Sequence, residues 1–258
     1  MTLNKEASQG ETSSDLSLLK DKLLFPLRDK VFSVDPAKIA IKRVFQGTKE
    51  YKDAIDIVNY SYNSFYGNNG EVVDVARDSL DGLNTTINLA ATQEFNGQSI
   101  VLTTLRFVHG SNLDVFELFE MEGEKKWPHE QGISNKKPGE IGKFSFHPIF
   151  EKKNPKYFSE EKTNIKKVIT RNLYENGMKQ MKEAGVEIPY SIFTKHVLNF
   201  IESTGISPFL KVENAKQKQS ESTDLVRKKF SKYWNPDKIG EYQPELFIAP
   251  WVLRPVRK

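Results

Sequence analysis

The sequence predicts one main α/β domain, with a mixed, twisted sheet at its centre and helices flanking the sheet. Three observations support this prediction. Strand-like and helix-like patterns alternate from residue 38 onwards, as they do in α/β proteins. Asn96-Gly97 separates two apolar runs and indicates a tight hairpin between antiparallel strands. The 17 Phe, 9 Tyr and 3 Trp among 258 residues supply enough apolar surface for one packed core.

The predicted elements follow from the spacing of apolar residues, which recur every second position in strands and every third or fourth in helices. In chain order we expect a strand at 38–46, a helix capped by Thr48 and ending before 67, hairpin strands at 85–92 and 98–108, a strand at 140–146, a long helix from Ser159 to Gly185, a strand at 189–193, a helix at 196–203, and strands near 208–212 and 245–253. Pro250 cannot donate to a ladder, so the last strand is expected at a sheet edge.

The chain is expected to divide at residue 36. Residues 1–36 are predicted to be a flexible N-terminal extension, because the first fourteen residues are polar and bury too little apolar surface to offset the entropy of ordering. Leucines between Leu16 and Leu24 indicate a short amphipathic segment within it, which either pads the core or binds a partner. Residues 37–258 are predicted to form the functional domain.

The composition excludes several classes of function. The 38 basic and 34 acidic side chains leave a net charge of only +4, so no nucleic-acid partner is expected. The absence of cysteine excludes disulfides, a thiolate nucleophile and cysteine-based metal sites, and it fits a cytoplasmic location. The polar N-terminus and the lack of a long apolar run predict no secretory signal and no integral membrane segment. No metal site is expected.

An ordered set of motifs remains after the common nucleotide, zinc and serine-hydrolase motifs prove absent. It comprises Asp78-Ser-Leu-Asp81, then Thr104-Leu-Arg106-Phe107, then Glu140-Ile-Gly-Lys143-Phe144-Ser-Phe146-His147-Pro148. This order resembles the acyl-homoserine-lactone (autoinducer) synthases and the long-chain N-acyl amino acid synthases. In those families a D-x-x-D loop precedes a G-T-x-R-L strand and a later E-x-x-R-F strand. Lys143 stands where they have arginine.

The resemblance implies the GNAT fold, with a bulge in the strand at 140–146, and a bacterial N-acyltransferase. Its expected reaction moves a fatty acyl group from an acyl carrier protein thioester to the amine of an amino acid or similar small molecule, by direct attack and with no bound cofactor. Members of the fold that use coenzyme A usually have a glycine-rich loop after this strand. Residues 149–155 contain no glycine, which favours the carrier protein over acyl-CoA as donor.

Three alternatives stay open at this point. The chain could be an autoinducer synthase that uses S-adenosylmethionine, or an N-acyltransferase that uses acyl-CoA. It could also be a GNAT-fold module without catalysis that binds an acyl chain or a partner protein, because a fold does not determine a function.

The resemblance also assigns roles to individual residues, each with a structural alternative. The expected roles are general base for Glu140, with His147 as the second candidate; substrate binding for Asp78, Asp81, Arg106 and Lys143; and an acyl-chain pocket for Phe107, Phe144 and Phe146. The alternatives are ion pairs for Glu140 and Arg106, turns for the aspartates and His147, and plain core for the aromatic residues. Basic residues at 162–171 and 227–232 either dock the acidic carrier protein or form solvated surfaces.

Overall fold

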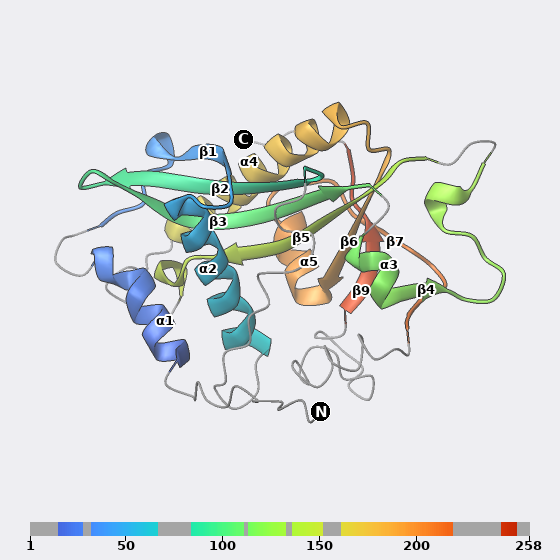
Figure 1. Ribbon diagram of the computed structural model, residues 1–258, viewed down its shortest axis with the longest axis horizontal. Coiled ribbons are helices and arrows are strands. Elements are labelled where there is room, and N and C mark those ends of the chain that lie inside the picture. The colour runs from blue at the N-terminus through green and yellow to red at the C-terminus, as the bar shows by residue number, and fades with distance from the viewer. Residues whose placement is uncertain are drawn as a thin grey trace, which may run out of the picture.

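A seven-stranded sheet forms the centre of the molecule, with helices packed against it (Figure 1). The computed structural model describes residues 15–27, 32–66, 84–110, 113–132, 136–151, 161–218 and 244–251. Four parts of the sequence prediction lie outside these residues: the polar tail at 1–14, Asp78, Asp81 and the basic segment at 227–232.

The order of elements confirms an α/β chain with a central mixed sheet. The elements are α1 (Asp15–Leu24), β1 (Ala40–Val44), α2 (Lys49–Tyr66), β2 (Thr86–Phe95), β3 (Gln98–His109), α3 (Asp114–Leu118), β4 (Phe119–Met121), β5 (Pro138–Phe146), α4 (Glu161–Glu183), β6 (Ile188–Thr194), α5 (Lys195–Glu202), β7 (Leu210–Lys211), β8 (Ala215–Gln217) and β9 (Pro244–Ile248). The sheet order is β1-β2-β3-β5-β6-β9-β7, and β4 pairs with β8 in a separate ladder. Among the strand pairs that the structure describes, β5 and β6 run parallel and the others are antiparallel.

Local sequence signals account for several element boundaries. Asn96 and Gly97 have φ angles of 51° and 73°, as a two-residue hairpin turn requires, and they join β2 to β3. Thr48 Oγ1 accepts a hydrogen bond from the backbone N–H of Tyr51 at 3.2 Å, which is the helix cap predicted for α2.

The predicted position of the last strand is wrong. β9 lies between β6 and β7 and pairs with both, so it is not an edge strand. Pro250 lies beyond the end of β9, and Pro244 occupies its first position, where a missing N–H donor is tolerated. The sequence also gave no indication of α3 or of the β4–β8 ladder.

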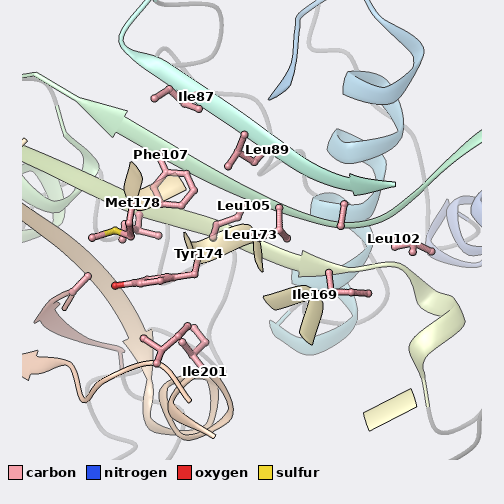
Figure 2. Close-up of a cluster of buried hydrophobic side chains, with 14 of the residues drawn as sticks. Ile87, Leu89, Leu102, Leu105, Phe107, Ile169, Leu173, Tyr174, Met178 and Ile201 are labelled. Carbon is pink, nitrogen blue, oxygen red and sulfur yellow. The ribbon is translucent and has the colours of Figure 1, made fainter. Parts of the chain in front are cut away.

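The main core lies between the sheet and α4. Figure 2 shows Ile87 and Leu89 of β2 and Phe107 of β3 beside Leu173 and Met178 of α4. Phe107 is fully buried, and Gly177 of α4 lies directly against its ring. A Cβ atom at residue 177 would come within 1.8 Å of Phe107 Cζ. Phe107 therefore lies in a tightly packed contact between the helix and the sheet. This position favours the core role, which was the alternative to the predicted acyl-chain pocket.

A second core lies between the opposite face of the sheet and helices α2 and α1. Ala90 and Val101 pack there against apolar residues of α2, with Leu23 of α1 in the same cluster. The segment after α1 returns to the main core, where Leu27 and Phe32 are buried. The described part of residues 1–36 therefore packs on the domain, as expected if the amphipathic segment pads the core.

Candidate functional site

The parallel strands β5 and β6 separate along their length. They pair at four positions, from Pro138 with Ile188 to Ile141 with Ser191. The hydroxyl of Ser191 donates to the carbonyl oxygen of Ile141 at 2.8 Å. Beyond this point β5 and β6 each continue, but no described pairing joins them. The two strands therefore diverge beyond Ile141 and Ser191, and we call the stretch where they no longer pair the gap.

A β-bulge lies on β5 beside this gap. Thr104 pairs with Ser145 and Arg106 with Gly142, so Leu105 lies opposite two residues, Lys143 and Phe144. Lys143 has a φ of 51°, a left-handed conformation that is uncommon for a residue with a side chain. The bulge implied by the resemblance is thus confirmed. Lys143 and Arg106 line the same cavity of about 10 Å³ beneath α2, about the size of one water molecule.

Arg106 and Glu140 lie on one face of neighbouring strands. Glu140 pairs with Val108, and Arg106 with Gly142, so the two charged residues occupy diagonal positions that long side chains can span. They are 2% and 5% exposed. Buried charges of this kind require hydrogen-bonded partners.

Helix α3 supplies described partners to both residues. Arg106 Nη2 lies 2.8 Å from Asp114 Oδ2, and the Asp114 side chain is 38% exposed. Glu140 Oε2 accepts the backbone N–H of Val115 at 3.0 Å. Glu140 Oε1 lies over Gly142, 3.6 Å from where a Cβ atom at that residue would be. One carboxylate oxygen is thus held by α3, and the other is directed along β5 toward the bulge.

His147, the second predicted base, lies at the end of β5 in a fully buried position. Its Nδ1 accepts the N–H of Ile149 at 3.1 Å, so its Nε2 carries the proton and donates to the carbonyl oxygen of Leu23 at 3.1 Å. Burial lowers the pKa of His147 from 6.5 to about 4. Both ring nitrogens therefore form hydrogen bonds, and the ring is neutral. These bonds join α1 to the turn after β5, which favours the turn-residue alternative for His147.

This buried ring predicts a specific pH dependence of stability. Between pH 6.5 and 4 the unfolded chain binds a proton at His147 that the folded chain excludes. The free energy of unfolding should therefore fall by up to about 3 kcal/mol as the pH falls through this window. Urea unfolding of the wild type and of His147→Asn at pH 7, 5.5 and 4.5 measures the effect. The variant should be less stable at pH 7 but lose less on acidification, and equal slopes would contradict the assignment.

Two of the predicted acyl-pocket residues lie where β5 leaves β6. Phe144 and Phe146 form an edge-to-face pair with ring centroids 4.9 Å apart. Phe200 of α5 contacts both rings, at 6.3 and 5.7 Å. The Lys166 ammonium of α4 lies 4.7 Å from the Phe146 centroid, a cation–π contact. All three rings are partly exposed, and we call this cluster the aromatic wall.

Sequence reasoning missed the contribution of α3 and of the segment after β4. Asp114 lies in a stretch whose only pattern is the short run Asp-Val-Phe-Glu-Leu. Beyond it, Phe116, Trp127 and His129 pack around Tyr190 of β6, the cross-strand partner of Glu140. The high density of aromatic and histidine residues between 116 and 129 was the feature of the sequence that could have indicated this cluster.

Within the described ranges, no group of three or more His, Asp or Glu side chains could hold a metal ion. No helix in that same part of the chain is long and apolar enough to cross a membrane.

The sequence matches no protein-family model and no curated protein sequence. Among solved structures, the chain is similar to FeeM, an N-acyl amino acid synthase from uncultured soil microbes, with 10% identity and a TM-score of 0.45 over 82% of this chain and 90% of that one. It is similar to the AHL synthase LasI, with 14% identity and a TM-score of 0.40 over 82% and 88%. It is also similar to Arabidopsis thaliana NAA60 in complex with acetyl-CoA, with 8% identity and a TM-score of 0.40 over 82% and 97%. The chain itself has the central mixed sheet flanked by helices that the sequence predicts, with a β-bulge on β5 and two parallel strands that pair along only part of their length.

Proposed function

We propose that this chain is an N-acyltransferase that moves a fatty acyl group from an acyl carrier protein thioester to the amine of an amino acid or similar small molecule. The observation that carries the proposal is that β5 and β6 stop pairing after Ile141, the residue that follows a buried carboxylate, Glu140. Backbone groups at such a gap pair with an extended ligand as a missing strand would. The amide-containing arm of a carrier-protein thioester has this form.

The reaction would proceed by direct attack on the thioester. The amine nitrogen bonds to the carbonyl carbon, and backbone N–H groups of β5 that face the gap stabilise the developing oxyanion. Glu140 Oε1, held beside Gly142, takes the proton that the amine loses. The carbon–sulfur bond then breaks and the thiolate is protonated from solvent. The chain has no cysteine, which agrees with a route that has no acyl-cysteine intermediate.

The turn after β5 supports a carrier protein as the donor. Its first three amides donate within the turn itself: Ile149 N–H to His147 Nδ1 at 3.1 Å, and the next two to carbonyl oxygens of the turn at 3.0 Å each. The pyrophosphate of coenzyme A needs several backbone N–H groups directed at it. These engaged amides leave this turn poorly suited to that task.

The aromatic wall supplies a surface for the acyl chain. Phe144 and Phe146 of β5 contact Phe200 of α5 where β5 no longer pairs with β6, and each methylene buried against these rings would contribute about 0.8 kcal/mol. On the opposite face, Lys143 and Arg106 approach the same cavity. Lys143 is the residue we propose for a carboxylate on the acceptor, because it carries an ammonium group, lies on the bulge and lines this cavity beside Arg106.

Thiol release from a panel of thioesters tests this function. Acyl carrier protein and acyl-CoA donors of several chain lengths are supplied with and without pooled amino acids, and a thiol reagent follows the reaction. The protein gives no background because it lacks cysteine. We expect amine-dependent release from carrier-protein donors, with the N-acyl product identified by mass spectrometry.

Other outcomes of the panel point to the remaining alternatives. Release from acyl-CoA alone would overturn the proposed donor. Methylthioadenosine and a lactone formed from S-adenosylmethionine would identify an autoinducer synthase. If no donor releases thiol with any amine, the remaining alternative is a GNAT-fold module that binds an acyl chain or a partner protein without catalysis.

A further inference from the structure

A cavity of about 520 Å³ lies at the end of the sheet where β3 finishes and β5 begins. Its lining runs from Gly110, just after β3, to Pro138, the first residue of β5, and includes residues of α3 and of the segment that follows β4. Figure 1 shows this segment extending past the end of the sheet. The volume lies within the range of about 300 to 1,000 Å³ that is usual for ligand sites, and the proposed reaction does not use this cavity.

Two aromatic rings form apolar walls of the cavity. Phe116 and Trp127 both line it, and their rings meet edge to face with centroids 4.8 Å apart. Tyr190, which is fully buried, contacts both rings, at 5.9 and 5.7 Å. Phe116 and Trp127 nevertheless stay partly exposed. They therefore offer a fixed surface on which a flat apolar group can pack.

The hydrogen bonds of His129 determine which of its ring nitrogens faces the cavity. The hydroxyl of Tyr190 accepts the backbone N–H of His129 at 3.2 Å and lies 3.0 Å from His129 Nδ1. This hydroxyl has one proton and donates it to Nδ1. Burial lowers the pKa of His129, so the ring is neutral at pH 7 and its proton is on Nε2. Since Nδ1 points to the buried Tyr190, Nε2 directs its N–H away from that residue, on the side of the cavity that His129 lines.

The charged groups of the cavity favour an anion. Lys136 and Lys137 both line it and are exposed. The Lys137 ammonium donates to the carbonyl oxygen of Ala184, and no residue in the described part of the chain pairs with the Lys136 ammonium. Glu130 is the one carboxylate among the described lining residues, and its Oε2 accepts the backbone N–H of Trp127 at 3.0 Å. Two ammonium groups thus face a single carboxylate.

We propose that this cavity binds an organic anion with a flat aromatic body, of the aryl carboxylate class. The aromatic body packs against Trp127 and Phe116. The carboxylate accepts the Nε2 proton of His129 and pairs with Lys136. The cavity borders the part of β5 that pairs with β6, whereas the proposed reaction uses the stretch beyond Ile141. The inference therefore does not depend on the proposed function.

Isothermal titration calorimetry of the full-length chain tests the class of ligand with probes of similar shape. These are 2-naphthylacetate, the neutral 2-naphthylacetamide and the cationic 2-(2-naphthyl)ethylamine. We expect 2-naphthylacetate to bind with a stoichiometry of one, and the amide and the amine to bind at least about tenfold more weakly, because each lacks the charged acceptor. Octanoate, an anion without a ring, should also bind at least about tenfold more weakly. Any other order, or no binding of 2-naphthylacetate, would overturn the inference.

Substitutions in the lining locate the bound probe. Lys136→Met removes an exposed ammonium group, so it should weaken binding of 2-naphthylacetate by at least about threefold and leave the weaker binding of the amide unchanged. Trp127→Leu removes one aromatic wall and should weaken both probes. Lys126→Met is the matched control, because Lys126 is exposed on the same segment and does not line the cavity.

The melting temperature of each variant shows whether it is folded. Because Lys136 is exposed, Lys136→Met should melt as the wild type does, even if Trp127→Leu is destabilised. Wild-type affinity of Lys136→Met for 2-naphthylacetate, or an equal loss of affinity in Lys126→Met, would show that the anion binds elsewhere and would overturn the inference.

Discussion

Replacing Glu140 with glutamine is expected to lower kcat/KM for amine-dependent acyl transfer by about 100-fold or more, the usual contribution of a positioned general base. Glutamine has nearly the same shape and can still accept the Val115 N–H that now bonds to Glu140 Oε2 at 3.0 Å. It cannot, however, take the proton that the amine loses when it attacks the thioester. The substitution should therefore lower the rate of acyl transfer without destabilising the fold. Steady-state thiol release measures it.

Two controls separate this effect from a loss of structure. The melting temperature of Glu140→Gln should lie close to that of the wild type, because the side chain keeps its size and its contact with α3. Glu117→Gln changes an exposed carboxylate on α3 and should leave turnover unaltered. Full activity of Glu140→Gln would exclude Glu140 as the base and move attention to solvent or to another group in the site.

Gly177→Ala is expected to destabilise the protein by about 2 kcal/mol or more, although alanine is the better helix former by about 1 kcal/mol. The reason is space. The added Cβ would lie 1.8 Å from Phe107 Cζ, and Phe107 is held inside the main core, so the ring or the helix must move. Urea unfolding with an exposed control on the same helix, Lys179→Ala, measures the cost.

Phe107→Leu should partly relieve the clash when it is combined with Gly177→Ala. The two substitutions are in contact, so their effects should be non-additive by about 1 kcal/mol or more. Strict additivity, or a stabilising effect of Gly177→Ala alone, would show that α4 does not pack on β3 as described. It would also reopen the possibility that Phe107 borders an acyl-chain tunnel.

Local signals in the sequence anticipated much of the sheet. Asn96-Gly97 predicted the hairpin because both residues readily adopt the positive φ angles that they show. Thr48 predicted the start of α2 because its hydroxyl caps the first turn. Such features depend on a few neighbouring residues, so they can be predicted from the sequence without knowledge of the fold.

The residues of the candidate site were predicted from the family resemblance and not from local sequence signals. Glu140, Lys143 and the bulge were expected from the order of motifs, since no local pattern distinguishes a bulge from a regular strand. Asp114 was not expected, because nothing in its own segment shows that a buried arginine on β3 lies 2.8 Å from it. For His147 the sequence left a base and a turn residue as alternatives, and its burial and its bond to Leu23, 124 residues earlier in the chain, favour the turn residue.

The sequence by itself determined the class of the fold, the hairpin, the main helices and the residues that could do chemistry, because periodicity, turn residues and side-chain type are local properties. Only the tertiary structure decided which residues meet. It placed β9 between β6 and β7, packed Phe107 against Gly177 and paired Arg106 with Asp114. The physical reason is that burial and ion pairing depend on contacts between distant parts of the chain, and these contacts exist only when the sheet and its helices are assembled.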